Sequence, residues 1–133
     1  MVVQALLGGD LQGGFAATNA VIAAVMGGAP LVSIMSLINR PYYRLWVQPE
    51  ITRVEELRGK TLGVSRFGSV NDNMTRILLR KKNLEGAVIV RQFGGTTETA
   101  AAFLHRQIAG AVISALRVNA PMRMLLDLSE LDF

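Results

Sequence analysis

Residues 60–69 read KTLGVSRFGS, and this stretch decides the fold. Lys60–Ser65 has the apolar and β-branched character of a buried strand. The next three residues, Arg66-Phe67-Gly68, form a glycine-containing loop, and Ser69 is a natural N-cap for a helix over Ser69–Lys82. The stretch therefore predicts a strand, a loop and a helix in immediate succession.

The helix over Ser69–Lys82 is the best-defined element of the sequence. Asp72 in its first turn and Arg80 to Lys82 in its last turn complement the helix dipole. Its apolar residues recur at i, i+4, i+7 and i+8, which places them on one face of the helix. They are Val70, Met74, Ile77 and Leu78.

The same alternation continues through a strand at Ala87–Phe93, a helix at Thr96–Arg106 and a strand at Ala109–Ser114. Residues 60–114 therefore predict the order β-α-β-α-β. Because crossovers between parallel strands are right-handed, we expect an α/β fold with a parallel sheet and helices on both faces. Around this core we expect an extended segment at Tyr42–Gln48, one helical turn at Val54–Leu57 and a strand at Met122–Leu126.

The first 38 residues carry a single charge, that of Asp10. The uncharged stretch from Leu11 to Asn39 is long enough to span a bilayer, but Gly27-Gly28-Ala29-Pro30 interrupts it with a helix-stop pattern. We therefore expect no membrane span. The elements expected instead are a helix at Val2–Leu7, a strand at Gly14–Ala17, a buried helix at Ala20–Met26 capped by Thr18 or Asn19, and a buried strand at Leu31–Ile38.

Composition and charge exclude several classes of function. Half of the 133 residues are apolar, and the net charge is +4. The chain has no cysteine, which excludes disulfides, thiolate metal sites and cysteine nucleophiles. Ten of the basic residues lie between residues 39 and 83, but the eight aromatic residues are too few for a nucleic-acid surface with interleaved rings. We expect no nucleic-acid partner.

No arrangement for catalysis is apparent. His105 is the only histidine and falls near the end of a predicted helix, where a surface or capping role is expected. Glu55-Glu56 lies in a polar turn, and no carboxylates pair at strand ends. The glycine pairs do not match a phosphate-binding or dinucleotide-binding loop. We predict a protein that is not an enzyme, without catalytic residues, metal or cofactor.

Small polar residues instead follow the predicted strands. In open α/β sheets, ligands bind beyond the carboxyl ends of the strands. A helix N-terminus, such as that at Ser69, adds unpaired backbone amides that attract an anion. Capping alone would explain any one of these residues, but the set recurs at one edge. The predicted ligand-binding residues are Thr18, Asn19, Ser36, Ser65, Arg66, Gly68, Ser69, Thr96 and Ser114.

The segment Glu55–Ser69 resembles a family signature. It reads EELRGKTLGVS followed by Gly-Ser, and is similar to the ELKGKxIGVxxxGS stretch of substrate-binding proteins that serve ABC importers of sulfonates, nitrate, taurine and thiamine precursors. Gln4–Asp10 resembles the ALxxGxxD helix end of their first lobe, and Ala24–Val32 the AxxGxPLV junction. Tyr43–Glu50 and Ala101–Ser114 resemble later segments in the same order.

This resemblance implies a periplasmic-binding-protein-like fold of type II, in which two lobes close on a small ligand by a hinge motion. It implies a partial first lobe in residues 1–41, an inter-lobe crossover in residues 42–50 and a near-complete second lobe in residues 51–133. Residues 11–38 would then lack sheet neighbours. We therefore expect a homo-oligomer that exchanges this segment between subunits.

The implied function is a solute-binding module of an ABC import system, or a truncated remnant of one. Its partners would be a small organic or anionic ligand and, in a full-length context, an ABC permease. We expect a periplasmic or lipid-anchored extracellular location if a longer precursor exists, and a cytoplasmic one if Met1 is the natural start, because no signal peptide is visible.

Two alternatives use the same fold. The first is a stand-alone cytosolic domain for ligand sensing or protein interaction. The second is an enzyme such as a pyrimidine-precursor synthase or a dehydratase, which would need histidine, cysteine or acidic residues at the cleft. The sequence supplies few of these.

Overall fold

The computed structural model describes residues 2–38, 40–114 and 122–130. Internal contacts divide the chain into two compact units, Met1–Asn39 and Arg40–Phe133. We call them the N-terminal unit and the C-terminal unit and describe each by itself.

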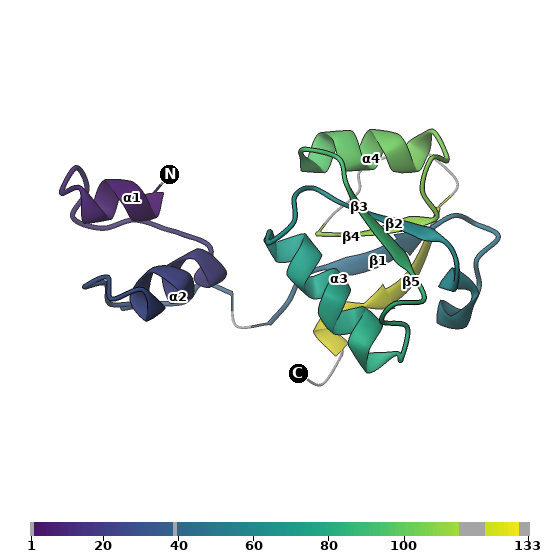
Figure 1. Ribbon diagram of the computed structural model, residues 1–133, viewed down its shortest axis with the longest axis horizontal. Coiled ribbons are helices and arrows are strands. Elements are labelled where there is room, and N and C mark those ends of the chain that lie inside the picture. The colour runs from purple at the N-terminus through teal and green to yellow at the C-terminus, as the bar shows by residue number, and fades with distance from the viewer. Residues whose placement is uncertain (1, 39, 115–121, 131–133) are drawn as a thin grey trace. The chain divides into compact units, whose positions relative to one another are not determined.

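The C-terminal unit is built on a five-stranded sheet in the order β3-β2-β4-β1-β5 (Figure 1). Its strands are β1 (Arg44–Val47), β2 (Thr61–Val64), β3 (Ile89–Gln92), β4 (Gly110–Ile113) and β5 (Arg123–Asp127). The strand β2 pairs in parallel with both β3 and β4, as the β-α-β-α-β pattern predicts. The strands expected in the sequence are thus present in this unit.

The sheet is not wholly parallel, contrary to what the sequence predicts, because it has antiparallel pairs on the side of β1 and β5. The strand β1 runs antiparallel to both β4 and β5. The connection from β1 to β2 holds one short 3-10 helix, η1 (Val54–Leu57), rather than a long helix that covers the sheet. Parallel neighbours usually need such a helical crossover, and β1 enters the sheet without one.

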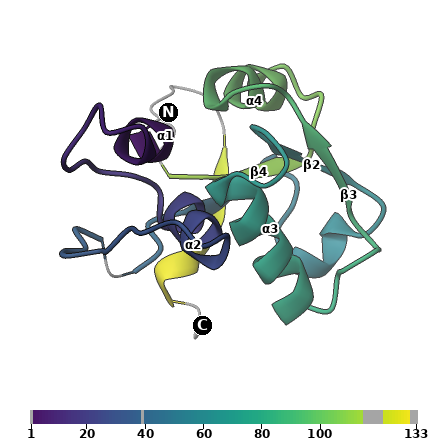
Figure 2. The same ribbon diagram turned by 60° about the vertical axis from the view of Figure 1, so that its left-hand side comes forward.

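Helices cover both faces of the sheet. The helix α3 (Val70–Lys81) lies on one face and α4 (Thr96–Leu104) on the other, in both views (Figures 1 and 2). Because successive side chains of a strand point to opposite faces, β4 serves two cores. Val112 packs in the core with Leu78 of α3, and its neighbour Ile113 packs with Phe103 of α4.

The buried face of α3 is more polar than its apolar periodicity predicts. Val70, Met74 and Ile77 are only half-buried, whereas the fully buried residues include Asn71 and Thr75. The hydroxyl of Thr75 is satisfied locally, since its Oγ1 donates to the carbonyl oxygen of Asn71 at 2.7 Å. The helix begins where expected, with Ser69 as its N-cap.

The N-terminal unit contains the two expected helices, α1 (Val2–Leu7) and α2 (Thr18–Met26). The strands expected at Gly14–Ala17 and Leu31–Ile38 are wrong, since neither segment is a strand. Ile34 is 94% exposed, and no residue of α2 is buried. An apolar run becomes a buried strand only beside other strands, and none is present within residues 2–38.

The expected cap of α2 is also displaced. The helix begins at Thr18, so its N-cap is Ala17 rather than Thr18 or Asn19, and no side chain caps it. The boundary between the units falls after residue 39, which puts the segment at residues 42–50 in the C-terminal unit, with β1 between β4 and β5. No helix in the described part of the chain is long and apolar enough to cross a membrane.

Gly110 lies where β4 approaches β1 most closely. A Cβ atom at this position would lie 2.5 Å from the carbonyl oxygen of Trp46, a backbone atom that cannot rotate away. We expect Gly110→Ala to lower the free energy of unfolding by about 1–3 kcal/mol, because the added methyl group forces the two strands apart. Trp46 is the only tryptophan, so its fluorescence during urea unfolding reports on this sheet.

Gly13→Ala is the matched control for this substitution. A Cβ atom there meets nothing within 4 Å, so the stability should change by less than about 0.5 kcal/mol. A Gly110→Ala variant as stable as this control would show that the close approach of the strands is not needed.

Candidate functional site

A cavity of about 200 Å³ lies beyond the carboxyl ends of β2 and β4. The chain reaches this edge three times in the C-terminal unit: after β2, after β4 and at the start of α4. The residue before β1 completes the wall, because β1 runs in the opposite direction. The lining residues are Tyr43, Ser65, Ser69, Val70, Asn71, Thr96, Ile113 and Ser114.

A buried amide lies at the centre of this wall. Asn71 is only 5% exposed, and its Oδ1 accepts a hydrogen bond from Ser65 Oγ at 2.8 Å and a short one from Ser69 Oγ. Ser69 Oγ also contacts the carbonyl oxygen of Arg66 at 2.6 Å, so its single proton serves one of these two acceptors at a time. Asn71 Nδ2 has no acceptor among the described residues.

Helix N-termini add further donors to the same edge. The first amides of a helix have no partner within it. At α3 the amide of Asp72 donates to Ser69 Oγ at 3.4 Å, while those of Val70 and Asn71 donate to no described residue. The helix α4 begins at Thr96 on the same cavity. The wall is therefore rich in hydrogen-bond donors.

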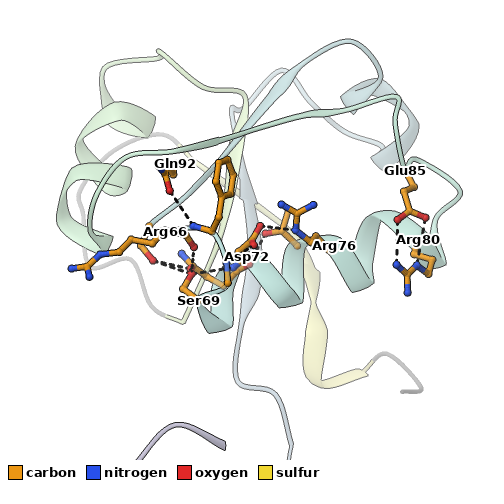
Figure 3. Close-up of polar contacts among 12 residues, drawn as sticks. Arg66, Ser69, Asp72, Arg76, Arg80, Glu85 and Gln92 are labelled. Carbon is orange, nitrogen blue, oxygen red and sulfur yellow. Dashed lines mark hydrogen bonds and ion pairs between the residues drawn. The ribbon is translucent and has the colours of Figure 1, made fainter. Parts of the chain in front are cut away.

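The loop between β2 and α3 is held in one conformation by its own polar contacts (Figure 3). Gly68 has a φ of 79°, which favours glycine, and its amide donates to Asp72 Oδ2 at 2.8 Å. The buried carboxylate of Asp72 also accepts from Arg76 Nε at 3.0 Å. Arg66 Nε donates to the carbonyl oxygen of Gly94 at 3.0 Å, which ties this loop to the turn before α4.

Tyr43 brings an aromatic ring to the cavity. Its ring centroid lies 5.0 Å from that of Tyr42. Burial, and after it the neighbouring Tyr42, together raise the pKa of Tyr43 to about 12. The Tyr43 hydroxyl is therefore protonated at physiological pH and can act as both donor and acceptor.

The structure brings together four of the nine predicted site residues, Ser65, Ser69, Thr96 and Ser114. Two others, Arg66 and Gly68, lie in the adjoining loop and shape it rather than line the cavity. The remaining three, Thr18, Asn19 and Ser36, lie in the N-terminal unit. Ser36 is exposed there, and its Oγ donates to the carbonyl oxygen of Ile38 at 3.1 Å.

Sequence reasoning missed four lining residues, Tyr43, Val70, Asn71 and Ile113. The signal for Asn71 was present, because an amide two positions after a serine N-cap sits in the first turn of the helix, beside that cap. Tyr43 gave no comparable signal. Its place depends on β1 pairing antiparallel with β4, which the sequence did not indicate.

The one histidine has no part in this cavity. His105 is exposed and forms the C-cap of α4, in agreement with the expected surface or capping role. Within the described residues, no group of three or more histidine or acidic side chains could hold a metal ion.

The fold and the cavity define the class of the protein. A sheet covered by helices on both faces, with a donor-rich cavity at the carboxyl ends of its central strands, is the architecture of an α/β ligand-binding lobe. The chain belongs to the NMT1/THI5-like family, a family of substrate-binding proteins, whose model matches residues 1–125. The resemblance inferred from Glu55–Ser69 is thereby confirmed.

No curated protein matches the chain. Among solved structures, it is similar to the second substrate-binding domain of a protein assigned as an amino acid ABC transporter from Streptococcus pneumoniae, at 19% identity and a TM-score of 0.44. That match covers 72% of this chain and 49% of the other, so this chain spans about half the length of that domain.

The raised pKa of Tyr43 gives a test of its environment. The folded-state pKa of about 12 lies above the ordinary value of 10.0, so the stability that the neutral phenol contributes is present below pH 10 and is lost as the pH rises toward 12. Absorbance of tyrosinate at alkaline pH should show a late-titrating group. Because the chain has only two tyrosines, Tyr42→Phe isolates it, and a titration near 10 in that variant would contradict the buried position.

Proposed function

We propose that the chain is a solute-binding module of an ABC import system, in which the C-terminal unit supplies one wall of the ligand cleft. The observation that carries this proposal is the amide of Asn71, which lines a cavity at the carboxyl ends of β2 and β4 and whose donor Nδ2 bonds no acceptor among the described residues. Family membership supports binding of a solute rather than its chemical conversion.

The size of the cavity supports the view that this wall is half of a site. Pockets that enclose drug-sized ligands have volumes of about 300–1,000 Å³. The present cavity is smaller, at about 200 Å³. A second wall closing over it by a hinge motion would complete the enclosure. We keep Thr18, Asn19 and Ser36 of the N-terminal unit as proposed ligand-binding residues.

The ligand is a small organic molecule or anion that presents a hydrogen-bond acceptor. Such an acceptor would pair with Asn71 Nδ2 and with the free amides of Val70 and Asn71. A carboxylate, sulfonate or nitrate group has this character, and the helix dipole of α3 favours negative charge. The ring of Tyr43 offers a surface for a flat heteroaromatic part.

The partner in this proposal is an ABC permease that receives the solute. The module would act where the binding proteins of ABC importers act, outside the cytoplasmic membrane. We propose that the exposed loop that carries Arg66 and Phe67 contacts this permease.

Ligand binding is tested by thermal unfolding with a panel of sulfonates, nitrate and pyrimidine-like compounds. A true ligand at a hundred times its Kd should stabilise the fold by about 2.7 kcal/mol, which raises the Tm by several degrees. Asn71→Leu keeps a similar volume but removes the donor, and it should abolish this rise.

Asn73→Leu is the control for that experiment, because Asn73 lies on the same helix but does not line the cavity. It should retain the response of the wild type. If no compound of the panel raises the Tm, binding of these solute classes by this chain is refuted.

We also propose that the apolar surface of the N-terminal unit is covered by a second copy of the chain. Large side chains are strongly exposed there, including Met26 at 83%, Val32 at 84% and Ile34 at 94%. Residues 31–38 are apolar except for two serines, lie between Pro30 and Pro41, and carry no charge that would keep two copies apart. Exchange of this segment between two subunits would give each copy the strand neighbours that it lacks.

Light scattering at micromolar concentration tests this association. The wild type should be a dimer or larger, and Ile34→Lys should shift it toward monomer, because the buried ammonium would have no partner. Leu104→Lys, at a 38% exposed position in the C-terminal unit, is the control and should leave the size unchanged. A monodisperse wild-type monomer would overturn the proposal.

A further inference from the structure

The sheet of the C-terminal unit has a second cavity at its opposite edge. It has a volume of about 270 Å³ and lies at the amino ends of β2 and β4, where β1 ends. Three segments line it: residues 48–51 after β1, residues 59–61 at the start of β2, and residues 106–109 before β4. None of these residues takes part in the cleft proposed above.

A buried amide with a fixed orientation lies in this cavity wall. Gln48 is only 6% exposed, and its Nε2 donates to the carbonyl oxygens of Phe103 at 2.8 Å and Ile108 at 3.2 Å. Both acceptors are carbonyl oxygens, so the amide group must turn its nitrogen toward them. This fixes which terminal atom of Gln48 is Nε2 and which is Oε1. This oxygen accepts no hydrogen bond from a described residue. At a cavity wall, such an acceptor can take a hydrogen bond from a donor group of a ligand.

Charged groups of both signs surround this acceptor. Arg106 Nη2 contacts Glu50 Oε1 at 2.5 Å, and Lys60 also lines the cavity but forms no salt bridge with a described residue. The pKa of Glu50 is lowered, first by its own backbone amide and then by Arg106 and Lys60, so it is ionised at neutral pH. The cavity thus presents two cations, one carboxylate and one neutral acceptor.

Arg106 is held in a backbone conformation that disfavours its side chain. Its φ is 57°, in the left-handed region, where glycine is the common residue after a helix. An arginine is strained in this conformation, and the residue lines the cavity. Such backbone outliers often mark functional positions.

We propose that this second cavity binds a small zwitterion that carries both a carboxylate and an ammonium group. The carboxylate pairs with Lys60 and with the remaining N–H groups of Arg106, and the ammonium donates to Gln48 Oε1 and to Glu50. The cavity is too small for a drug-sized ligand and suits a molecule with few heavy atoms. Binding here joins β1, β2 and the connection before β4, so it stabilises the sheet from the edge opposite the cleft.

The test uses the full chain labelled with ¹⁵N and three probes. Glycine should shift the side-chain amide resonances of Gln48 in a saturable manner. Trimethylglycine has the same charges but no N–H donor, and acetate has no ammonium group, so both should bind at least about fivefold more weakly. Absence of any saturable shift with glycine, or equal binding of glycine and trimethylglycine, would overturn the proposal.

Two variants separate binding from folding. Arg106→Gly removes the guanidinium and relieves the left-handed backbone, so it should weaken glycine binding about fivefold without loss of stability. Asn83→Gly is the matched control, because Asn83 is the other non-glycine residue described with a positive φ, at 52°. Unchanged glycine binding in Arg106→Gly would contradict the site.

Asn71→Leu separates this site from the proposed cleft, because Asn71 lines only the first cavity. Glycine binding should survive this substitution. If glycine binding is lost with Asn71→Leu but retained with Arg106→Gly, the zwitterion binds in the cleft, the second site is refuted and the proposed solute-binding function stands.

Discussion

The central position of β2 is the constraint on which the C-terminal unit depends. It is hydrogen-bonded to β3 on one side and to β4 on the other, although β3 and β4 follow it in sequence. The chain therefore moves outward from β2 to β3 and then back across β2 to β4. With right-handed crossovers, a reversal of direction puts α3 and α4 on opposite faces, and it brings their N-termini to one edge. The strand order alone therefore brings the positions of Ser65, Ser69 and Thr96 to the edge where the cavity lies.

Two buried side-chain amides, Asn71 and Gln48, lie at opposite edges of this sheet and present opposite hydrogen-bonding groups to the cavities there. At the carboxyl edge of β2, Asn71 uses its oxygen to accept from serine hydroxyls and keeps a donor free. At the amino edge, Gln48 uses its nitrogen to hold the α4–β4 connection and keeps an acceptor free. In each amide, one end bonds described residues of the fold, and the other end bonds none of them. The end without a described partner can exchange hydrogen bonds with a molecule in the neighbouring cavity.

The β-α-β-α-β core could be predicted from sequence because each of its elements carries a local signal. Ser69 caps α3, and the apolar runs of β2 and β4 are bounded by glycine and polar residues. The antiparallel entry of β1 could not be predicted, because strand direction depends on pairing partners far along the chain. For the same reason Tyr43 was missed at the cavity, whereas the serines that follow parallel strands were found. The prediction of a strand at Leu31–Ile38 was wrong for another reason. Its composition is that of a buried strand, but the described residues of the N-terminal unit include no strand that could pair with it.

The contrast between the units shows where stability and affinity come from. In the C-terminal unit, β2 and β4 have hydrogen-bonded neighbours on both sides and a helix on each face, so burial is complete at Leu62 and Val112. The N-terminal unit has Val3 as its buried hydrophobic residue among those described. A folded sheet with a half-open cavity can exist without its counterpart, but it can hold a ligand only weakly, because one wall leaves most of the ligand surface in water. Affinity therefore depends on whatever supplies the second wall.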